Sequence, residues 1–360
     1  MKVPAVDLAV RFKPYRERFH EVLDRVLEHG QVILGPEVQA FEQAVARYVG
    51  VKHALAVANG TDALVLGLRA LGVTDGEVVT TAMSYLASTS SIALAGATPV
   101  FADVGPDLNL DVDAVAAAIG PKTKAILVVH LGGNPARMQD LYRLAKARGV
   151  KLIEDCAQAL GAVSGANAGN LSDLGAVSFH PLKNLGAVGD AGAIFTNDDA
   201  VAANLRLARN HGHSSRDQCE FWSINSRMDS LQAGFLSAML DDYPAVLEAR
   251  RKQAERYRAA LAGIVEFPVV NPGALPSYNF FYTIVERRDD LQRRLLDDGI
   301  DAKIHYPIPI HQLNAAREIA VGQLPQTEYL TQRILSLPLG PHLVDSQIEF
   351  VIEKVGEFYA

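Results

Sequence analysis

The chain has 360 residues, of which 49% are hydrophobic and 21% are charged, a composition typical of a globular protein with a large buried core. Its net charge of −7 argues against a nucleic-acid partner, which would require a basic surface. There is no apolar run long enough to span a membrane and no signal-peptide core, and only two cysteines occur, so we expect a cytoplasmic protein without disulfides.

The first half of the chain alternates short apolar strands with helices. Amphipathic spacing predicts a helix over residues 14–29 that stops at Gly30, and Gly35-Pro36 opens a second helix. From there we predict strands at 53–58, 77–81, 99–104, 125–130, 150–155, 176–179 and 193–196. Helices are predicted at 63–71, 112–119, 138–148 and 198–210, and a further helix follows the strand 77–81 and ends at residue 93. This alternation indicates an α/β fold with a mainly parallel sheet, and such sheets bind ligands at the carboxyl ends of their strands.

The pattern changes after residue 210. Residues 211–228 are polar and aperiodic, which is typical of a functional loop, and a long helix is predicted over 229–261 with a kink or break at Pro244. Beyond it we predict strands at 265–270, 280–286 and 302–304, and helices at 291–298 and over the last eighteen residues. The chain is therefore expected to form a large α/β domain with N-terminal helices, residues 1–244, and a small α+β domain, residues 245–360.

A single lysine, Lys183, stands in the nearly uncharged stretch 178–192, between two short apolar segments. Most lysines are solvated, so an exposed ammonium is the ordinary interpretation of such a residue. Burial would instead lower the pKa of its amine, and a neutral amine can attack a carbonyl carbon. Which interpretation holds depends on the residues that accompany Lys183.

Polar residues follow two of the other predicted strands. The run Asn59-Gly60-Thr61-Asp62 opens a helix, where N–H groups and a hydroxyl suit an anion such as phosphate, although Thr61 would also serve as an ordinary cap. Glu154 and Asp155 end a strand and point to opposite faces, so only one of them needs to face a ligand. Such a carboxylate either keeps a pyridine-type nitrogen protonated or pairs with a neighbouring base.

Two further residues, Ser178 and Tyr85, add to the possible ligand contacts described above. Ser178 offers a second hydroxyl to a phosphate, and the ring of Tyr85 could stack on a planar cofactor, although a lone aromatic residue more often belongs to the core. A phosphate cradle, an acid, an aromatic ring and a lysine together indicate a pyridoxal phosphate site, with no metal.

Seven segments, taken in order and with their spacing, match a known family: 29–37, 59–63, 154–158, 178–184, 189–192, 225–229 and 305–311. Over nearly its whole length the chain resembles the DegT/DnrJ/EryC1/StrS sugar aminotransferases. The resemblance implies fold type I of the pyridoxal phosphate enzymes and a homodimer whose active sites are shared between the subunits.

The resemblance also implies roles for individual residues. Lys183 would form a Schiff base with pyridoxal 5'-phosphate, Asp155 would partner the pyridine nitrogen, and Gln158 would lie beside the ring oxygen. The remaining cofactor contacts would come from Gly60, Thr61 and Ser178 at the phosphate, Tyr85 at the ring, and Asn225 of the neighbouring subunit. Relatives contact the sugar or the amino donor at positions that correspond to His211, Arg227, His305 and Tyr306.

The expected reaction moves an amino group from an amino acid, by resemblance L-glutamate, to a nucleotide-linked keto-sugar, with pyridoxamine phosphate formed in between. The segments around Asn59, Asn225 and His305 favour a 3-keto sugar, while a 4-keto sugar and a non-catalytic cofactor-binding regulator stay open. A nicotinamide-dependent dehydrogenase is rejected, because no Gly-x-Gly-x-x-Gly follows the first strand.

Four positions depart from the family pattern, and they leave the identity of the sugar open: Gly133, Leu160, Leu182 and Ala191. The polar loop 211–228, which includes His213, Arg216 and Trp222, either senses the nucleotide or sugar or forms a dimer contact.

Overall fold

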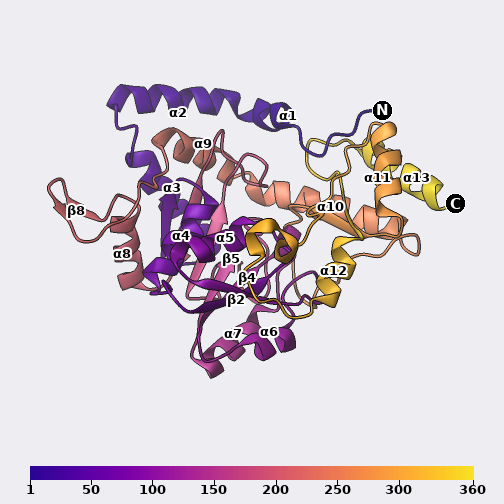
Figure 1. The fold of residues 1–360 in the computed structure, drawn as a ribbon. Helices are drawn as coiled ribbons and strands as arrows, with labels where there is room; N and C mark the ends of the chain where they lie inside the picture. Colours follow the sequence, from indigo (N-terminus) through magenta and orange to yellow (C-terminus); the bar gives the residue numbers. More distant parts are fainter.

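The computed structural model describes residues 1–360, and its centre is a seven-stranded sheet (Figure 1). The strands lie in the order β1-β7-β6-β5-β4-β2-β3, and only β7 runs antiparallel to its neighbours. The mainly parallel α/β sheet predicted from the sequence is thereby confirmed. The strand bounds are β1 His53–Val57, β2 Glu77–Thr81, β3 Thr98–Ala102, β4 Thr123–Val129, β5 Lys151–Asp155, β6 Leu174–Ser178 and β7 Gly192–Thr196.

Helices cover both faces of this sheet, because alternate strand residues point to opposite sides and both sides are apolar. Ala54 and Ala56 of β1 join the core beneath α3 (Pro36–Val49) and α9 (Ser230–Leu240). Leu55 and Val57 join the core on the other face, beneath α4. The helices that connect the strands are α4 Gly60–Ala70, α5 Ala87–Ala95, α6 Val112–Ala118 and α7 Met138–Arg148, and α8 Asp199–Ala208 follows the last strand.

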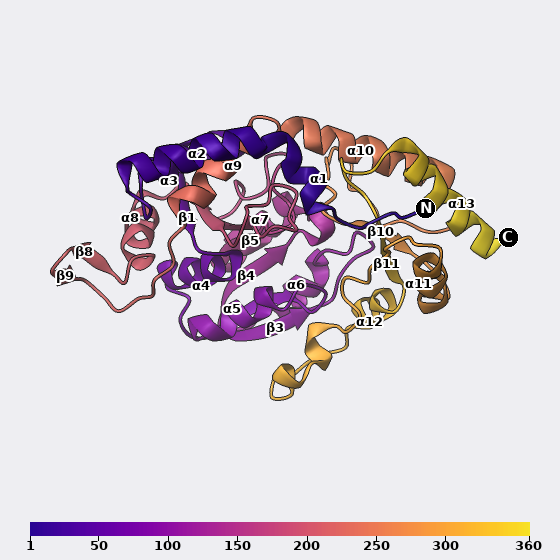
Figure 2. The same cartoon turned by 90° about the horizontal axis from the view of Figure 1, so that it is seen from above.

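The N-terminal segment begins with α1 (Leu8–Phe12) and a 3₁₀ turn, followed by α2 (Arg16–His29). As predicted, α2 stops at Gly30, whose φ of 69° lies in the left-handed region that glycine adopts readily. Figures 1 and 2 show α2 lying across α9 at the surface of the large domain. Residues 1–7 then run toward the C-terminal part of the molecule, where Val3 pairs with Ile300.

The C-terminal part has a sheet and a core of its own. Strands β10 (Phe281–Ile284) and β11 (Ile334–Leu337) pair antiparallel, and they pack with α10 (Tyr243–Ala260), α11 (Arg288–Asp297) and α13 (Asp345–Tyr359). The predicted break near Pro244 is confirmed, since α9 ends at Leu240 and Pro244 lies in the first turn of α10. The division of the chain into domains at residues 244 and 245 stays a prediction.

Two predicted strands are wrong. Within 265–270 there are only two isolated bridges, from Val265 to Ala262 and from Glu266 to Ile284, and within 302–304 only Lys303 forms one, to Ser336. The sequence interpretation also missed β11 and α12 (Pro325–Thr331). No helix in the structure is both long and apolar enough to cross a membrane.

The segment 211–228 is only partly irregular, because it contains a small hairpin of β8 (His213–Ser215) and β9 (Gln218–Cys219). The hairpin projects from the large domain at the end opposite the C-terminal sheet (Figures 1 and 2). Beside it, the side chain of Trp222 is 95% exposed. We call residues 211–224 the projecting arm.

Candidate active site

The carboxyl ends of β1 and β6 meet through the antiparallel strand between them. Gly192, the first residue of β7, pairs with Val57 on one side and with Ser178 on the other. A Cβ atom on Gly192 would lie 2.5 Å from the backbone of Asn59, so only glycine lets the three segments approach this closely. The loop after β1 and the end of β6 therefore lie side by side.

This contact forms a cradle at the N-terminus of α4. Asn59 caps the helix by accepting a hydrogen bond from the N–H of Asp62 at 2.8 Å, and Ala63 N–H donates to the Asn59 carbonyl. The N–H groups of Gly60 and Thr61 are left without a partner inside the helix. A Cβ atom on Gly60 would lie 2.8 Å from the Cβ of Ser178, so the Ser178 hydroxyl lies at the same place. The arrangement suits a phosphate group.

Asp155 ends β5, the central strand of the sheet, and its side chain is buried. One carboxylate oxygen accepts a hydrogen bond from the Ser88 hydroxyl at 2.7 Å, and the other accepts from the N–H of Ala157 at 3.0 Å. Both bonds fix the position of the carboxylate. The arrangement fits an acid that partners a protonated ring nitrogen.

Glu154, the preceding residue, points to the opposite face of the sheet, as expected for adjacent strand residues. It accepts hydrogen bonds from His130 Nε2 at 3.0 Å, from the N–H groups of Gly169 and Leu171, and from the Ser172 hydroxyl at 2.7 Å. His130, Glu154 and Cys156 could in principle hold a metal ion. Because the acceptor atoms of Glu154 are already occupied by protein donors, this buried cluster is structural.

Lys183 lies in the loop between β6 and β7, and it is half-buried. Burial lowers the pKa of its amine to about 8, while the nearby carboxylate of Asp155 acts in the opposite direction. Arg11 fixes the loop, because its Nη1 donates to the carbonyl oxygens of Pro181 at 2.7 Å and of Lys183 itself at 2.8 Å. The structure thus brings together the lysine and the acid that the sequence analysis paired.

Gln158 and Tyr306 lie beside this pair. The Gln158 amide oxygen accepts from the N–H of Gly132 at 2.6 Å, and its nitrogen donates to the Tyr306 hydroxyl at 3.3 Å. Burial, and then the charge of Asp155, raises the pKa of Tyr306, so its hydroxyl stays protonated. The ring of Tyr85 lies 5.8 Å from that of Tyr306, and Tyr85 is half exposed. An exposed ring is free to stack on a planar ligand.

His305 stacks on Phe280 with ring centroids 3.8 Å apart, and its Nδ1 lies 3.0 Å from the Ser336 hydroxyl. Burial, and then the neighbouring charge of Lys183, lowers the pKa of His305 to about 4. His305 is therefore a neutral hydrogen-bonding group near the lysine at physiological pH.

The other three predicted residues lie on the connection between α8 and α9. His211 begins the projecting arm and has a φ of 60°. Arg227 donates from Nη1 to Asn210 at 2.8 Å, while its buried Nε has no partner. Asn225 is exposed, and its neighbour Ser226 accepts from the N–H of Ala58, just ahead of the phosphate cradle. No hydrogen bond joins these three residues to Lys183, so their roles in binding stay predictions.

The four departures from the family pattern have different surroundings. Gly133 has a φ of 84°, and a Cβ there would overlap the Ser277 hydroxyl and lie 2.6 Å from the Gln158 carbonyl, so this backbone requires glycine. Leu160 and Ala191 are buried in the core beneath α3 and α9. Leu182 is exposed and faces a cavity near Lys183.

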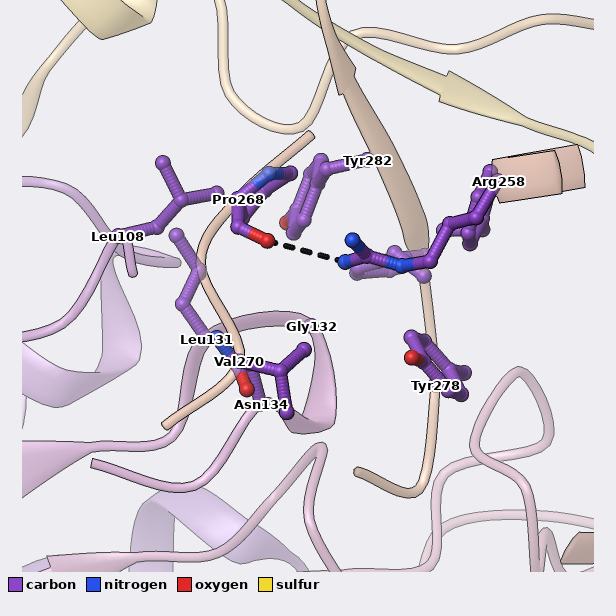
Figure 3. A pocket seen from close by; sticks show the side chains of 11 residues that line it. Leu108, Leu131, Gly132, Asn134, Arg258, Pro268, Val270, Tyr278 and Tyr282 are labelled. Carbon is purple, nitrogen blue, oxygen red and sulfur yellow. Dashed lines mark hydrogen bonds between the residues drawn. The ribbon is translucent and has the colours of Figure 1, made fainter. Parts of the chain in front are cut away.

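A different cavity, shown in Figure 3, can be set aside as a substrate site. It has a volume of about 20 Å³, enough for one water molecule. Arg258 crosses it and donates to the Pro268 carbonyl at 2.9 Å. None of the predicted site residues is among its lining residues, which include Leu108, Leu131 and Tyr282.

Sequence reasoning missed three polar residues near Lys183. Ser88 lies on α5, Arg11 on α1 and Asn279 just before β10. No local pattern distinguishes them from a helix serine, a surface arginine or a loop asparagine, because their partners are distant in the sequence.

The residues present fit pyridoxal 5'-phosphate. At the N-terminus of α4, the absence of a side chain on Gly60 lets the Ser178 hydroxyl lie beside the free N–H groups of Gly60 and Thr61, which are the donors that a phosphate needs. Asp155 offers a carboxylate held by two hydrogen bonds, and Lys183 offers an amine with a lowered pKa.

Comparison with known proteins agrees with this geometry. The family model described as "DegT/DnrJ/EryC1/StrS aminotransferase family" matches residues 14–356. The "Pleiotropic regulatory protein" of Geobacillus stearothermophilus is 40% identical over 100% of this chain and 99% of its own. The "dTDP-3-amino-3,4,6-trideoxy-alpha-D-glucose transaminase" of Streptomyces venezuelae is 39% identical over 99% of this chain and 96% of its own.

A solved structure is also similar throughout. The crystal structure of S. venezuelae DesV in complex with a ketimine intermediate superposes with a TM-score of 0.97 at 39% identity, covering 99% of this chain and 98% of that one. The chain therefore belongs to the DegT/DnrJ/EryC1/StrS aminotransferase family, and it is a pyridoxal phosphate-dependent sugar aminotransferase of fold type I.

Proposed function

We propose that the enzyme transfers the amino group of L-glutamate to C3 of a nucleotide-linked 3-keto sugar. The main structural support is the pairing of the Lys183 amine, with a pKa near 8, and the fixed carboxylate of Asp155. Support for the sugar comes from the Streptomyces relative, whose name describes a dTDP-3-amino sugar transaminase. A 4-keto sugar is the alternative.

Each proposed residue has a distinct task. Pyridoxal phosphate, when bound, supplies an electron sink for the bond broken next to the amino group. The N–H groups of Gly60 and Thr61 and the hydroxyl of Ser178 bind its phosphate, and Asp155 keeps its ring nitrogen protonated. Lys183, as a neutral amine, would move a proton between the α-carbon of the amino donor and the cofactor.

We also propose that the active enzyme is a homodimer. The projecting arm has an almost fully exposed Trp222, and large exposed aromatic side chains are enriched where proteins meet. In the dimer, Asn225 of one subunit would reach the cofactor phosphate of the other. This favours a dimer contact for the arm; the alternative is that the arm senses the substrate through His213 and Arg216.

We place the enzyme in the cytoplasm. Both cysteines are unpaired, and Cys219 is exposed, which suits a reducing compartment.

The covalent role of Lys183 can be tested without turnover. Borohydride reduction of the holoenzyme, followed by peptide mass spectrometry, should place the pyridoxyl group on Lys183. Lys183→Ala should abolish both this adduct and transamination, whereas Lys252→Ala, at an exposed position of α10, should retain both. A Lys183→Ala variant that still turned over without added amine would refute the assignment.

The substrate is tested by product analysis. The holoenzyme is incubated with glutamate and a panel of 3-keto and 4-keto sugars linked to dTDP and UDP. A 3-amino product supports the proposal, and an exclusively 4-amino product refutes it. If no donor and sugar give product although the cofactor is bound, the regulatory role named for the Geobacillus relative becomes the better explanation.

A further inference from the structure

A cavity of about 320 Å³ lies where the N-terminal segment passes over the C-terminal sheet. Figure 2 shows residues 1–7 running from α1 toward β10 and β11, and Val3 pairs there with Ile300. The walls come from six parts of the chain: residues 5–11, 182, 250, 279–281, 301–305 and 336–342. The cavity is thus enclosed by segments that lie far apart in the sequence.

The walls carry a surplus of positive charge. Arg11, Arg250 and Lys303 line the cavity together with a single carboxylate, Asp301. Asp301 lies 2.6 Å from Lys303 and is neutralised by it. Neither arginine forms an ion pair with any carboxylate, so the charges of Arg11 and Arg250 are left without a counter-charge.

The charged side chain of Arg250 is buried, since the residue is only 4% exposed. Its Nε donates to the Tyr278 carbonyl at 2.8 Å and its Nη2 to the Asn279 carbonyl at 3.2 Å. These acceptors satisfy hydrogen bonds but do not compensate a full positive charge. Burial, and then the charge of Arg11, lowers the pKa of Arg250 to about 9. An anion in the cavity would stabilise both guanidinium groups.

A buried amide at the cavity also lacks a partner. Asn279 is 6% exposed, and neither its Oδ1 nor its Nδ2 forms a hydrogen bond within the protein. A buried amide left unpaired in this way is costly, and its presence in a native fold points to a polar ligand. Asn279 can both donate to a carboxylate and accept from an N–H.

The cavity adjoins the reacting lysine. Leu182, the residue before Lys183, lines it, as does His305, whose pKa is affected by the charge of Lys183. Asn279 also lines a smaller space that contains Lys183 and Gln158. Asn279 therefore lies between the space at Lys183 and the cavity and lines both.

We propose that this cavity binds the side-chain carboxylate of the amino donor, through Arg11, Arg250 and Asn279, and so selects a dicarboxylic amino acid. The inference rests on the proposed aminotransferase function. The two uncompensated arginines supply the positive charge that one carboxylate needs, and the unpaired amide of Asn279 supplies a neutral contact to it. Arg11 then links donor binding to the Lys183 loop, whose carbonyl groups it already contacts.

The first test measures binding alone. Glutarate, which has the two carboxylates but no amine, is titrated calorimetrically into the holoenzyme. Loss of one charge-assisted contact in Arg11→Met should weaken binding roughly 10- to 100-fold, and Asn279→Leu should weaken it by a smaller factor. The matched control is Arg16→Met, at an exposed position of α2, which should bind normally. Unchanged affinity in both cavity variants overturns the proposal, as does equal affinity for inorganic phosphate.

The second test separates the subsite from a structural effect on the Lys183 loop. In wild type, the kcat/KM for L-glutamate should greatly exceed that for L-norvaline, which lacks the second carboxylate. In Arg11→Met this preference for glutamate should be lost, mainly because the KM for glutamate rises, while the kcat/KM for norvaline is retained. A uniform fall in kcat for both donors overturns the proposal.

Failure of the subsite and failure of the proposed function give different results. If no donor is turned over but glutarate binding still depends on Arg11, the carboxylate site stands without the transamination. If transamination proceeds but neither glutarate binding nor donor preference changes when Arg11 or Asn279 is substituted, the enzyme assignment stands and the subsite is refuted.

Discussion

The amine of Lys183 should be unusually nucleophilic at neutral pH, because burial lowers its pKa from 10.5 to about 8. At pH 7 a pKa of 8 leaves about 9% of the amine neutral, whereas an ordinary lysine has about 0.03%. The neutral fraction is therefore larger by roughly 300-fold. The change is tested in the cofactor-free protein, where the amine is not covalently occupied.

The assay is competitive acetylation with a trace of acetic anhydride between pH 6 and 11, followed by mass spectrometry of the peptide that contains Lys183. The same peptide in the urea-unfolded protein is the internal control. The folded protein should give a midpoint near 8 and the unfolded protein a midpoint near 10.5. Equal midpoints in the two states would refute the argument from burial.

A substitution at Asp155 tests the sign of the electrostatic contribution. The Asp155 carboxylate stabilises the ammonium form and so raises the pKa of Lys183 against the larger effect of burial. Asp155→Asn removes that charge while keeping the shape, and the midpoint of Lys183 should fall further. A rise in the midpoint would show that the two groups do not interact as described.

Three further predictions concern the supports of the site. Ser88→Ala removes the hydroxyl that donates to Asp155, which should cost about 1.5–3 kcal/mol of cofactor affinity; spectroscopic titration with unchanged affinity would contradict this. Gly133→Ala should destabilise the fold by at least about 2 kcal/mol more than Gly149→Ala, because both glycines have positive φ but only Gly133 is crowded; equal denaturation midpoints would count against it. Glu154→Gln should cost about 3 kcal/mol of unfolding free energy, since it disrupts a buried acceptor of four bonds, and retained stability would show that the cluster is dispensable.

The large domain could be predicted closely because its signals are local. Each strand of the parallel sheet is a short apolar run, and each helix has its own cap or glycine stop, as Asn59 and Gly30 illustrate. Pro244 marked the break between α9 and α10 for the same reason. The C-terminal part was harder to predict, since residues 265–270 have the apolar pattern of a strand but form only two isolated bridges. In the same part, β11 becomes a strand through its pairing with β10.

Those site residues could be predicted that lie in a recognisable motif and whose chemistry suits the same cofactor. Lys183 and Asp155 could be paired because their residue types suit one cofactor, and the structure places them together through adjacent strand ends. Ser88, Arg11 and Asn279 could not be found this way. Each acts through a partner that is remote in the sequence, and no spacing rule connects helix α1 to the loop at Pro181.

The exposed Trp222 of the projecting arm has a practical consequence. It is the only tryptophan in the chain, and it is 95% exposed in a single subunit. Tryptophan fluorescence therefore reports from this one place, without any label. An indole in water emits at long wavelength, and one that is covered by a second subunit emits at shorter wavelength, so dilution of the protein gives an optical readout of assembly from a native side chain.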